Sequence, residues 1–176
     1  AVKMQTTPPQ EYPGGGWVGN ENLVNYLQNG FVAEDGPVVN GPARWKRNSC
    51  SNTYEYSYDD WCVAQLALAL GRKDVAATFL KRAQSWRNVF DADTGFARPR
   101  KASGEWVSPF DPYTTPGFVE GNAWQYTWFV PQDVPGLVSA LGRDRFLSRL
   151  NEGFEKSATL RFSAPSAQHE LTPLNH

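Results

Sequence analysis

Residues 53–70, which read TYEYSYDDWCVAQLALAL, decide the fold class of this 176-residue chain. Large apolar or aromatic side chains recur in this stretch at the spacing of one helix face, at Tyr54, Tyr58, Trp61, Cys62, Leu66 and Ala69. Gly71 follows directly and predicts the end of the helix, because glycine adopts the left-handed conformation that closes helices. The stretch therefore predicts a long helix with one apolar face.

A second helix is predicted over residues 74–89. Its apolar stripe is formed by Val75, Phe79, Ala83 and Trp86. Only residues 71–73 connect the two helices, and so short a connection predicts that they pack antiparallel. Helix pairs of this kind are typical of an α/α toroid, in which paired helices ring a central pocket, and also of a simple helical bundle.

Shorter elements are predicted along the rest of the chain. Helices are expected over residues 20–27, after Glu120-Gly121, from the N-cap Asp133 to Gly142, and over residues 143–155. Residues 96–98 and 105–107 predict two short strands of one hairpin. The predicted fold class is therefore mainly α, with long loops and one short β-hairpin.

Proline and glycine divide the chain into three parts. Residues 1–18, with Pro8-Pro9 and Gly14-Gly15-Gly16, predict an irregular lead-in, and residues 19–156 hold the predicted helices. Residues 157–176 show no periodic pattern and stop without a closing signal. We therefore expect a domain over residues 19–156 that is incomplete at its C-terminus, followed by an irregular tail.

Composition excludes several classes of function. The 17 basic and 18 acidic residues give a net charge of -1, with no basic stripe for nucleic acid. No apolar run approaches the ~18 residues of a membrane span. Cys50 and Cys62 match no zinc pattern, and their placement favours free or buried thiols over a disulfide. Aromatic residues make up 14% of the chain, which suits either a sugar site or a core built on large side chains.

Glu55 is the first candidate for chemistry. It lies in the first turn of the predicted helix, among Tyr54, Tyr56 and Tyr58. Apolar surroundings raise the pKa of a carboxylic acid, which suits a general acid that must stay protonated near neutral pH. The spacing Asn52-x-x-Glu55 also fits a capping box, which would only cap the helix. Of these two interpretations, the residues alone favour the cap.

The second candidate is the stretch EGNAWQY, which begins at Glu120. Its carboxylate and the side-chain amides of Asn122 and Gln125 offer oxygen donors at a predicted helix start. Such donors suit a hard cation such as Ca²⁺, and they would equally bind sugar hydroxyls. Trp124 and Trp128 stand one turn apart and could flank a ligand, although a helix start with a buried aromatic pair gives the same pattern.

A third pattern, Asp91-x-Asp93-x-Gly95, resembles the start of a calcium-binding loop. The twelfth position of such a loop is Ala102 in this chain, where a calcium loop needs glutamate. The pattern therefore predicts a turn and no metal site.

Several sequence words together are more specific than any single motif. In order they are YEYSYDDWC at 54–62, FLKR at 79–82, NVFD at 88–91, TGF at 94–96, RPR at 98–100, EGNAWQYTW at 120–128 and PQDVPGL at 131–137. In this order and spacing they resemble glycoside hydrolase family ninety-two, whose members are calcium-dependent exo-acting α-mannosidases that invert anomeric configuration. The resemblance spans residues 23–155.

The resemblance implies roles for individual residues. Glu55 matches the general acid of the family, which protonates the leaving oxygen. Gln125 and Asn122 match the segment that lines the sugar and calcium site, and are expected to bind Ca²⁺. Glu120 and Trp124 are expected to bind the substrate.

The resemblance also implies a larger protein, with an N-terminal β-sandwich and an (α/α)6 toroid of which this chain is a part. The family's general base lies in a Gly-Asn-Asp-Asp word far downstream, and this chain lacks that word. An inverting glycosidase needs a second carboxyl to activate water. The chain alone is therefore expected to be inactive and to need the remainder of its catalytic domain.

Together these observations predict a secreted or periplasmic enzyme that hydrolyses terminal α-linked mannose from glycans. The alternative is a catalytically incomplete module of the same fold that only binds mannose-containing glycans.

Overall fold

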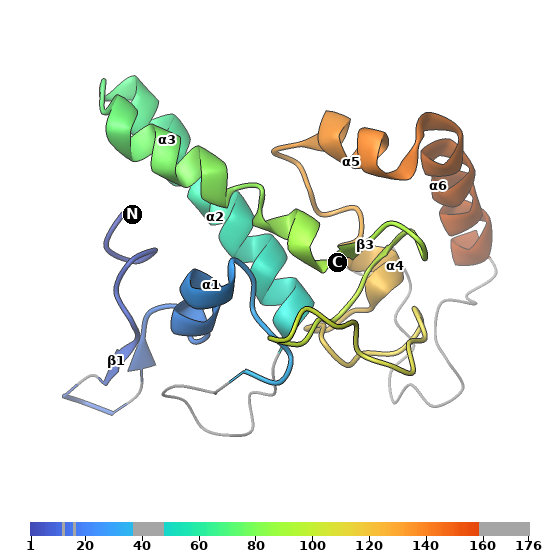
Figure 1. The fold of residues 1–176 in the computed structure, drawn as a ribbon, viewed down its shortest axis with the longest axis horizontal. Helices are drawn as coiled ribbons and strands as arrows, with labels where there is room; N and C mark the ends of the chain where they lie inside the picture. Colours follow the sequence, from blue (N-terminus) through green and yellow to red (C-terminus); the bar gives the residue numbers. More distant parts are fainter. Residues whose placement is uncertain (12, 16, 37–47, 159–176) are drawn as a thin grey trace.

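The computed structural model of the chain describes residues 1–11, 13–15, 17–36 and 48–158. In these ranges helices dominate, and the sheets are two antiparallel pairs of very short strands (Figure 1). In chain order the elements are β1 (Gln10–Glu11), β2 (Trp17–Val18), α1 (Leu23–Asn29), α2 (Ser49–Ala69), α3 (Lys73–Arg82), the 3₁₀ helix η1 (Ser85–Val89), β3 (Phe90–Asp91), β4 (Phe96–Ala97), α4 (Ala123–Tyr126), α5 (Val134–Leu141) and α6 (Arg143–Ala158). The predicted mainly α class is confirmed.

Helices α2 and α3 lie side by side as the antiparallel pair that the sequence predicts (Figure 1). Phe79 of α3 is buried against Val63 and Ala64 of α2. The single second helix that the sequence predicts is instead broken into α3 and η1. This break brings Trp86 and Val89, both fully buried, into the main core of the molecule.

Helix α2 begins earlier than predicted, and a distant loop closes its start. The N–H groups of Cys50 and Ser51 donate to the carbonyl of Gly117, at 3.0 and 3.3 Å. Asn52 and Glu55 consequently lie inside the helix, and the capping box predicted between them is wrong. The first N–H groups of a helix need partners, and here they find one in a loop that no local sequence pattern identifies.

The β-hairpin lies one segment earlier than predicted. Strand β3 pairs with β4, with Asp91 opposite Phe96. Residues 105–107, predicted as a strand, contribute only an isolated bridge between Arg100 and Trp106. The strand at Phe96 therefore exists as predicted, but its partner precedes it in the chain.

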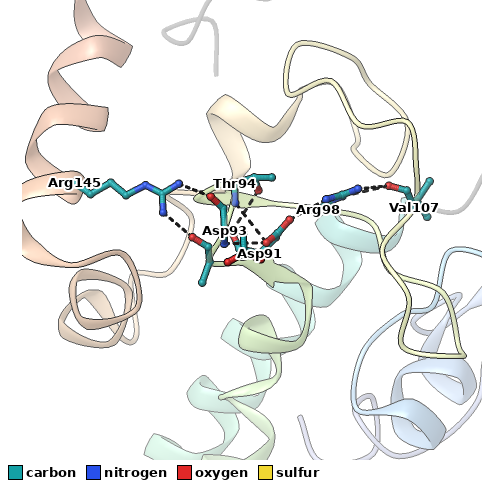
Figure 2. Close-up of polar contacts among 7 residues, drawn as sticks. Asp91, Asp93, Thr94, Arg98, Val107 and Arg145 are labelled. Carbon is teal, nitrogen blue, oxygen red and sulfur yellow. Dashed lines mark hydrogen bonds and ion pairs between the residues drawn. The ribbon is translucent and has the colours of Figure 1, made fainter.

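Asp91 fixes the turn of this hairpin (Figure 2). Its carboxylate accepts the N–H of Asp93 at 3.0 Å and forms an ion pair with Arg98 at 3.0 Å. Burial alone would raise the pKa of Asp91, but the hydrogen bonds from Arg98, Asp93 and Thr94 outweigh burial and lower it. From α6, Arg145 donates to the carbonyl of Asp93 at 2.8 Å. The predicted turn is confirmed, and the Asp91 carboxylate holds it through backbone N–H groups and Arg98.

A buried ion pair ties α1, α2 and α3 together. Asp60 of α2 is fully buried, and both of its carboxylate oxygens face the guanidinium of Arg82, at 2.8 and 2.9 Å. The hydroxyl of Tyr26 donates to the same carboxylate at 2.8 Å. Arg82 also donates to the carbonyl of Gln5, which fastens the predicted lead-in to the helix pair. The predicted irregular lead-in, residues 1–18, also contains the short antiparallel pair of β1 and β2, which the sequence did not predict.

The two cysteines are free, as predicted, with Cys50 buried and Cys62 exposed. Asp133 caps α5 by accepting the N–H of Gly136 at 3.0 Å, also as predicted. Within the described ranges, none of the helices is long and apolar enough to cross a bilayer. The predicted tail, residues 157–176, lies almost wholly outside the described residues.

Candidate active site

Four of the five residues predicted for the site line one pocket of about 590 Å³. They are Glu55, Glu120, Trp124 and Gln125. The pocket is walled by α2, by the turn at residues 119–121, by α4 and the residues after it, and by the C-terminal half of α6. The fold thus brings together two sequence words, around Glu55 and around Glu120, that are far apart in the chain.

Glu55 reaches the pocket from α2 and is exposed to solvent there. Surrounding protein atoms still remove part of its hydration, and this desolvation raises the pKa of the carboxyl. The negative charge of Asp59, one turn further along α2, raises it again. A carboxyl with a raised pKa that opens onto a pocket can keep a proton and deliver it to a ligand.

Glu120 enters the pocket from the turn before α4, and its backbone is unusual. With φ of 48°, it is the one non-glycine residue in the described ranges that has a positive φ. Side chains with a Cβ atom seldom adopt this conformation, and residues that do so cluster at functional sites. The strained backbone therefore makes Glu120 a candidate functional residue of this pocket.

Asn122 and Gln125 form a capping box at the start of α4. The Asn122 side chain accepts the N–H of Trp124 at 3.0 Å, and Oε1 of Gln125 accepts the N–H of Asn122 at 3.0 Å. Gln125 lines the pocket, whereas Asn122 is only 1% exposed. The capping pattern that the sequence suggested at Asn52 is thus found at Asn122.

This donor set fits a calcium ion only in part. A carbonyl oxygen has two lone pairs, so Gln125 can cap the helix and still offer one lone pair to the pocket. Ca²⁺ takes six to eight oxygen ligands. No group of three or more histidine, cysteine or acidic side chains suited to a metal occurs in the part of the chain that the structure describes. Gln125 can therefore supply one ligand, and a complete shell would need others.

Aromatic rings make up much of the pocket wall. Trp124 is 3% exposed and packs edge-on against Phe96, with ring centroids 4.8 Å apart, so only a small part of it faces the pocket. Trp128 packs in the same way on Phe146, at 5.6 Å. Such rings offer apolar surface on which the C–H face of a sugar can pack.

Tyr126 and Phe154 are among the wall residues that were not singled out from the sequence as site residues. Tyr126 lies inside the same word as Gln125, so the word itself could have indicated it. Phe154 is 61% exposed at the pocket and comes from α6. Its signal, an apolar residue near the end of an amphipathic helix, cannot be told from a core position without the fold.

The chain is similar in sequence and in structure to proteins of one known family. The sequence model for the catalytic domain of glycosyl hydrolase family 92 matches residues 1–175. A family 92 α-mannosidase from Bacteroides thetaiotaomicron is similar in structure, with a TM-score of 0.67 and 39% identity over 76% of this chain and 17% of its own. An inverting mannosidase of the same family and organism has a TM-score of 0.72 and 27% identity, over 86% of this chain and 19% of its own.

A second structure of the first α-mannosidase and one further relative are also similar to this chain. The same α-mannosidase, solved in complex with mannoimidazole, has a TM-score of 0.68 and 38% identity over 77% of this chain and 18% of its own. An uncharacterized secreted glycosidase from Arthroderma benhamiae is 31% identical over an alignment of 128 residues, and the match covers 58% of this chain and 16% of that protein. The chain therefore spans less than a fifth of the length of these relatives.

Proposed function

This chain belongs to glycosyl hydrolase family 92, and we propose that it forms part of the catalytic domain of an enzyme that removes terminal α-linked mannose from glycans. The observation that carries the proposal is the shared pocket, in which an acid with a raised pKa stands with a second carboxylate and an aromatic wall. Similarity to two mannosidases of the family supports mannose as the sugar. Similarity to a secreted glycosidase supports a secreted or periplasmic location.

Glu55 acts as the general acid in this proposal. Its surroundings disfavour the charged form and raise its pKa, which favours the protonated form that a general acid needs. It donates that proton to the glycosidic oxygen as the bond to mannose breaks. Hydrolysis with inversion needs a second carboxylate to take a proton from the attacking water, and this base lies outside the chain, on the remainder of an (α/α)6 toroid.

Glu120 and Gln125 orient the sugar in the same proposal. The Glu120 carboxylate accepts hydrogen bonds from sugar hydroxyls, and the rings of Trp124 and Trp128 contact the apolar face of the sugar. Gln125 is the residue that would hold Ca²⁺, with Asn122 behind it at the start of α4. When bound, the ion would coordinate sugar hydroxyls and favour a distorted ring.

The test uses the complete protein, meaning this chain together with the rest of its catalytic domain. We expect release of mannose from an α-linked mannobiose, with β-mannose as the first product by NMR, because inversion gives the opposite anomer. A calcium chelator should abolish the release, and added Ca²⁺ should restore it. Mannose release that survives the chelator would exclude the calcium role, and α-mannose as the first product would exclude inversion.

The same assay decides between an enzyme and a binding module. Glu55→Gln keeps the shape of the side chain and removes the proton, so it should lower kcat about 100- to 10,000-fold. A complete protein that binds mannobiose but releases no mannose would instead support the catalytically incomplete module.

A further inference from the structure

Hydroxyl groups hold both polar backbone groups of Val119, the residue before Glu120. The N–H of Val119 donates to Oγ of Ser51 on α2, at 2.9 Å. Its carbonyl accepts the hydroxyl of Tyr126, the last residue of α4, at 3.0 Å. These two hydrogen bonds join α2, the turn and α4 through the backbone of Val119.

These two hydrogen bonds, which we call the Val119 clamp, precede the strained part of the chain. Glu120 has φ of 48°, so without support it would relax to a negative φ. After it, Gly121 leaves no room for a side chain, because a Cβ atom there would lie 2.7 Å from Oε1 of Gln125 and 3.0 Å from the Tyr126 ring. The turn is therefore fixed on both sides of Glu120.

The clamp also connects the two carboxylates of the pocket. Ser51 and Glu55 are four residues apart on α2, so they lie on the same face of the helix, one turn from each other. Ser51 is 1% exposed and cannot contact a ligand itself. The same helix that presents Glu55 therefore also sets the position of the turn that presents Glu120.

We propose that Ser51 and Tyr126 are positioning residues, which hold Glu120 in its left-handed conformation opposite Glu55 so that it can bind the sugar. The proposal rests on the proposed function, because it takes Glu120 as a substrate contact. A clamp with a merely structural role would stabilise the loop and leave substrate binding unchanged.

The test compares Ser51→Ala and Tyr126→Phe in the complete protein, since each variant removes one hydroxyl of the clamp. If Glu120 binds the sugar equally in the ground state and the transition state, its loss raises KM and leaves kcat unchanged. We expect each clamp variant to raise KM about five- to tenfold, as for the loss of one hydrogen bond. In a Glu120→Ala background, neither variant should raise KM further, because the group that they position is gone.

Ser57→Ala is the matched control. Ser57 is as buried as Ser51, lies on the same helix, and donates its hydroxyl to the carbonyl of Thr53 at 2.6 Å. This variant should leave KM unchanged. Amide hydrogen exchange gives a second measurement that needs no activity, and Ser51→Ala should speed the exchange of the Val119 amide because that amide loses its acceptor.

The outcomes separate the two proposals. A rise in KM for Ser51→Ala that persists in the Glu120→Ala background overturns the positioning role, as does an unchanged KM in both clamp variants. A wild-type protein that releases no mannose overturns the proposed function instead. In that case the exchange of the Val119 amide decides the clamp, and an unchanged rate in Ser51→Ala overturns it.

Discussion

Two carboxylates on α2, Glu55 and Asp60, lie five residues apart and in opposite environments. Asp60 is fully buried, and the groups of Arg82 and Tyr26 surround its oxygens. Glu55 opens onto the pocket and takes part in none of the ion pairs found among the described residues. The same residue class on one helix therefore serves the fold on one side and is available for chemistry on the other.

Loss of hydration acts on both groups, completely at the buried Asp60 and in part at the exposed Glu55. It raises the pKa of Asp60 to about 6, although the charge of Arg82 and the hydroxyl of Tyr26 both lower it. It also raises the pKa of Glu55, where Asp59 adds to the effect. Asp60 has a charged partner in Arg82 and a hydroxyl partner in Tyr26, which makes it a structural group. Glu55 has no ion-pair partner among the described residues and faces the pocket, which leaves it available as a proton donor in the proposed mechanism.

The largest expected effect is on the Asp60 side. Arg82→Met removes the charged partner of a fully buried carboxylate, and breaking a buried pair in this way costs about 3–5 kcal/mol of unfolding free energy. Chemical denaturation of the complete catalytic domain measures this cost. Arg72→Ala is the control, because its ion pair with Asp74 spans 3.9 Å between exposed side chains and should cost less than about 0.5 kcal/mol. Equal losses of unfolding free energy in the two variants would show that the buried pair of Asp60 and Arg82 stabilises the fold no more than an exposed pair does.

A smaller loss of unfolding free energy is expected for substitution of Asn122 at the pocket, because Asn122, like Asp60, stabilises the fold through its hydrogen bonds. Asn122→Ala removes the N-cap of α4 and should cost about 1 kcal/mol of unfolding free energy. Asn122→Asp keeps an oxygen acceptor and should restore most of the stability. If Asn122→Ala were neutral, the hydrogen bonds of the capping box would have no part in fixing α4.

A smaller effect of opposite sign is expected at Glu120. Glu120→Gly relieves the positive φ and should leave the unfolding free energy unchanged or raise it by up to about 1 kcal/mol. Glu105→Gly, at an exposed loop position, serves as the control and should lower it slightly. A clear loss of stability in Glu120→Gly would show that the side chain supports the fold, as Asp60 does.

The smallest effect is the pH dependence of Glu55. Its pKa is raised in the folded state, so Glu55 favours the fold while protonated, and this contribution is lost as the pH rises through the folded pKa. Glu55→Gln cannot ionise, so its stability should gain on the wild type as the pH rises through that range. NMR titration of the carboxyl should give a pKa above 4.5 that falls in Asp59→Asn. A pKa at or below 4.5 would remove the reason to regard Glu55 as an acid.

Much of the site could be predicted because its residues lie in short, specific words. Glu55 and Glu120 were found in this way, and the fold brings both to one pocket. Periodicity likewise predicted the α2–α3 pair, but the face it assigned to the interior of α2 is wrong. Leu66 is 53% exposed and Cys62 is exposed, whereas Val63 and Ala64 pack against Phe79 of α3.

The remainder depends on contacts between distant segments. The start of α2 is closed by Gly117, and the turn at Val119 is held by Ser51, 68 residues before it in the chain. The wall residue Phe154 belongs to α6, whose direction only the folded chain defines. Local propensity carries no information on such partners, so the sequence suggested a capping box at Asn52 that tertiary contacts overrule.

The most direct test of the central claim is the dependence of Glu55→Gln on the leaving group, measured in the complete protein. A general acid is needed when the leaving alcohol is a sugar and is hardly needed when it is dinitrophenolate, which departs without a proton. We expect kcat/KM of Glu55→Gln to fall about 100- to 10,000-fold with α-mannobiose and less than about tenfold with dinitrophenyl α-mannoside. Equal losses with both substrates would contradict the account, because Glu55 would then serve binding or folding and not proton transfer.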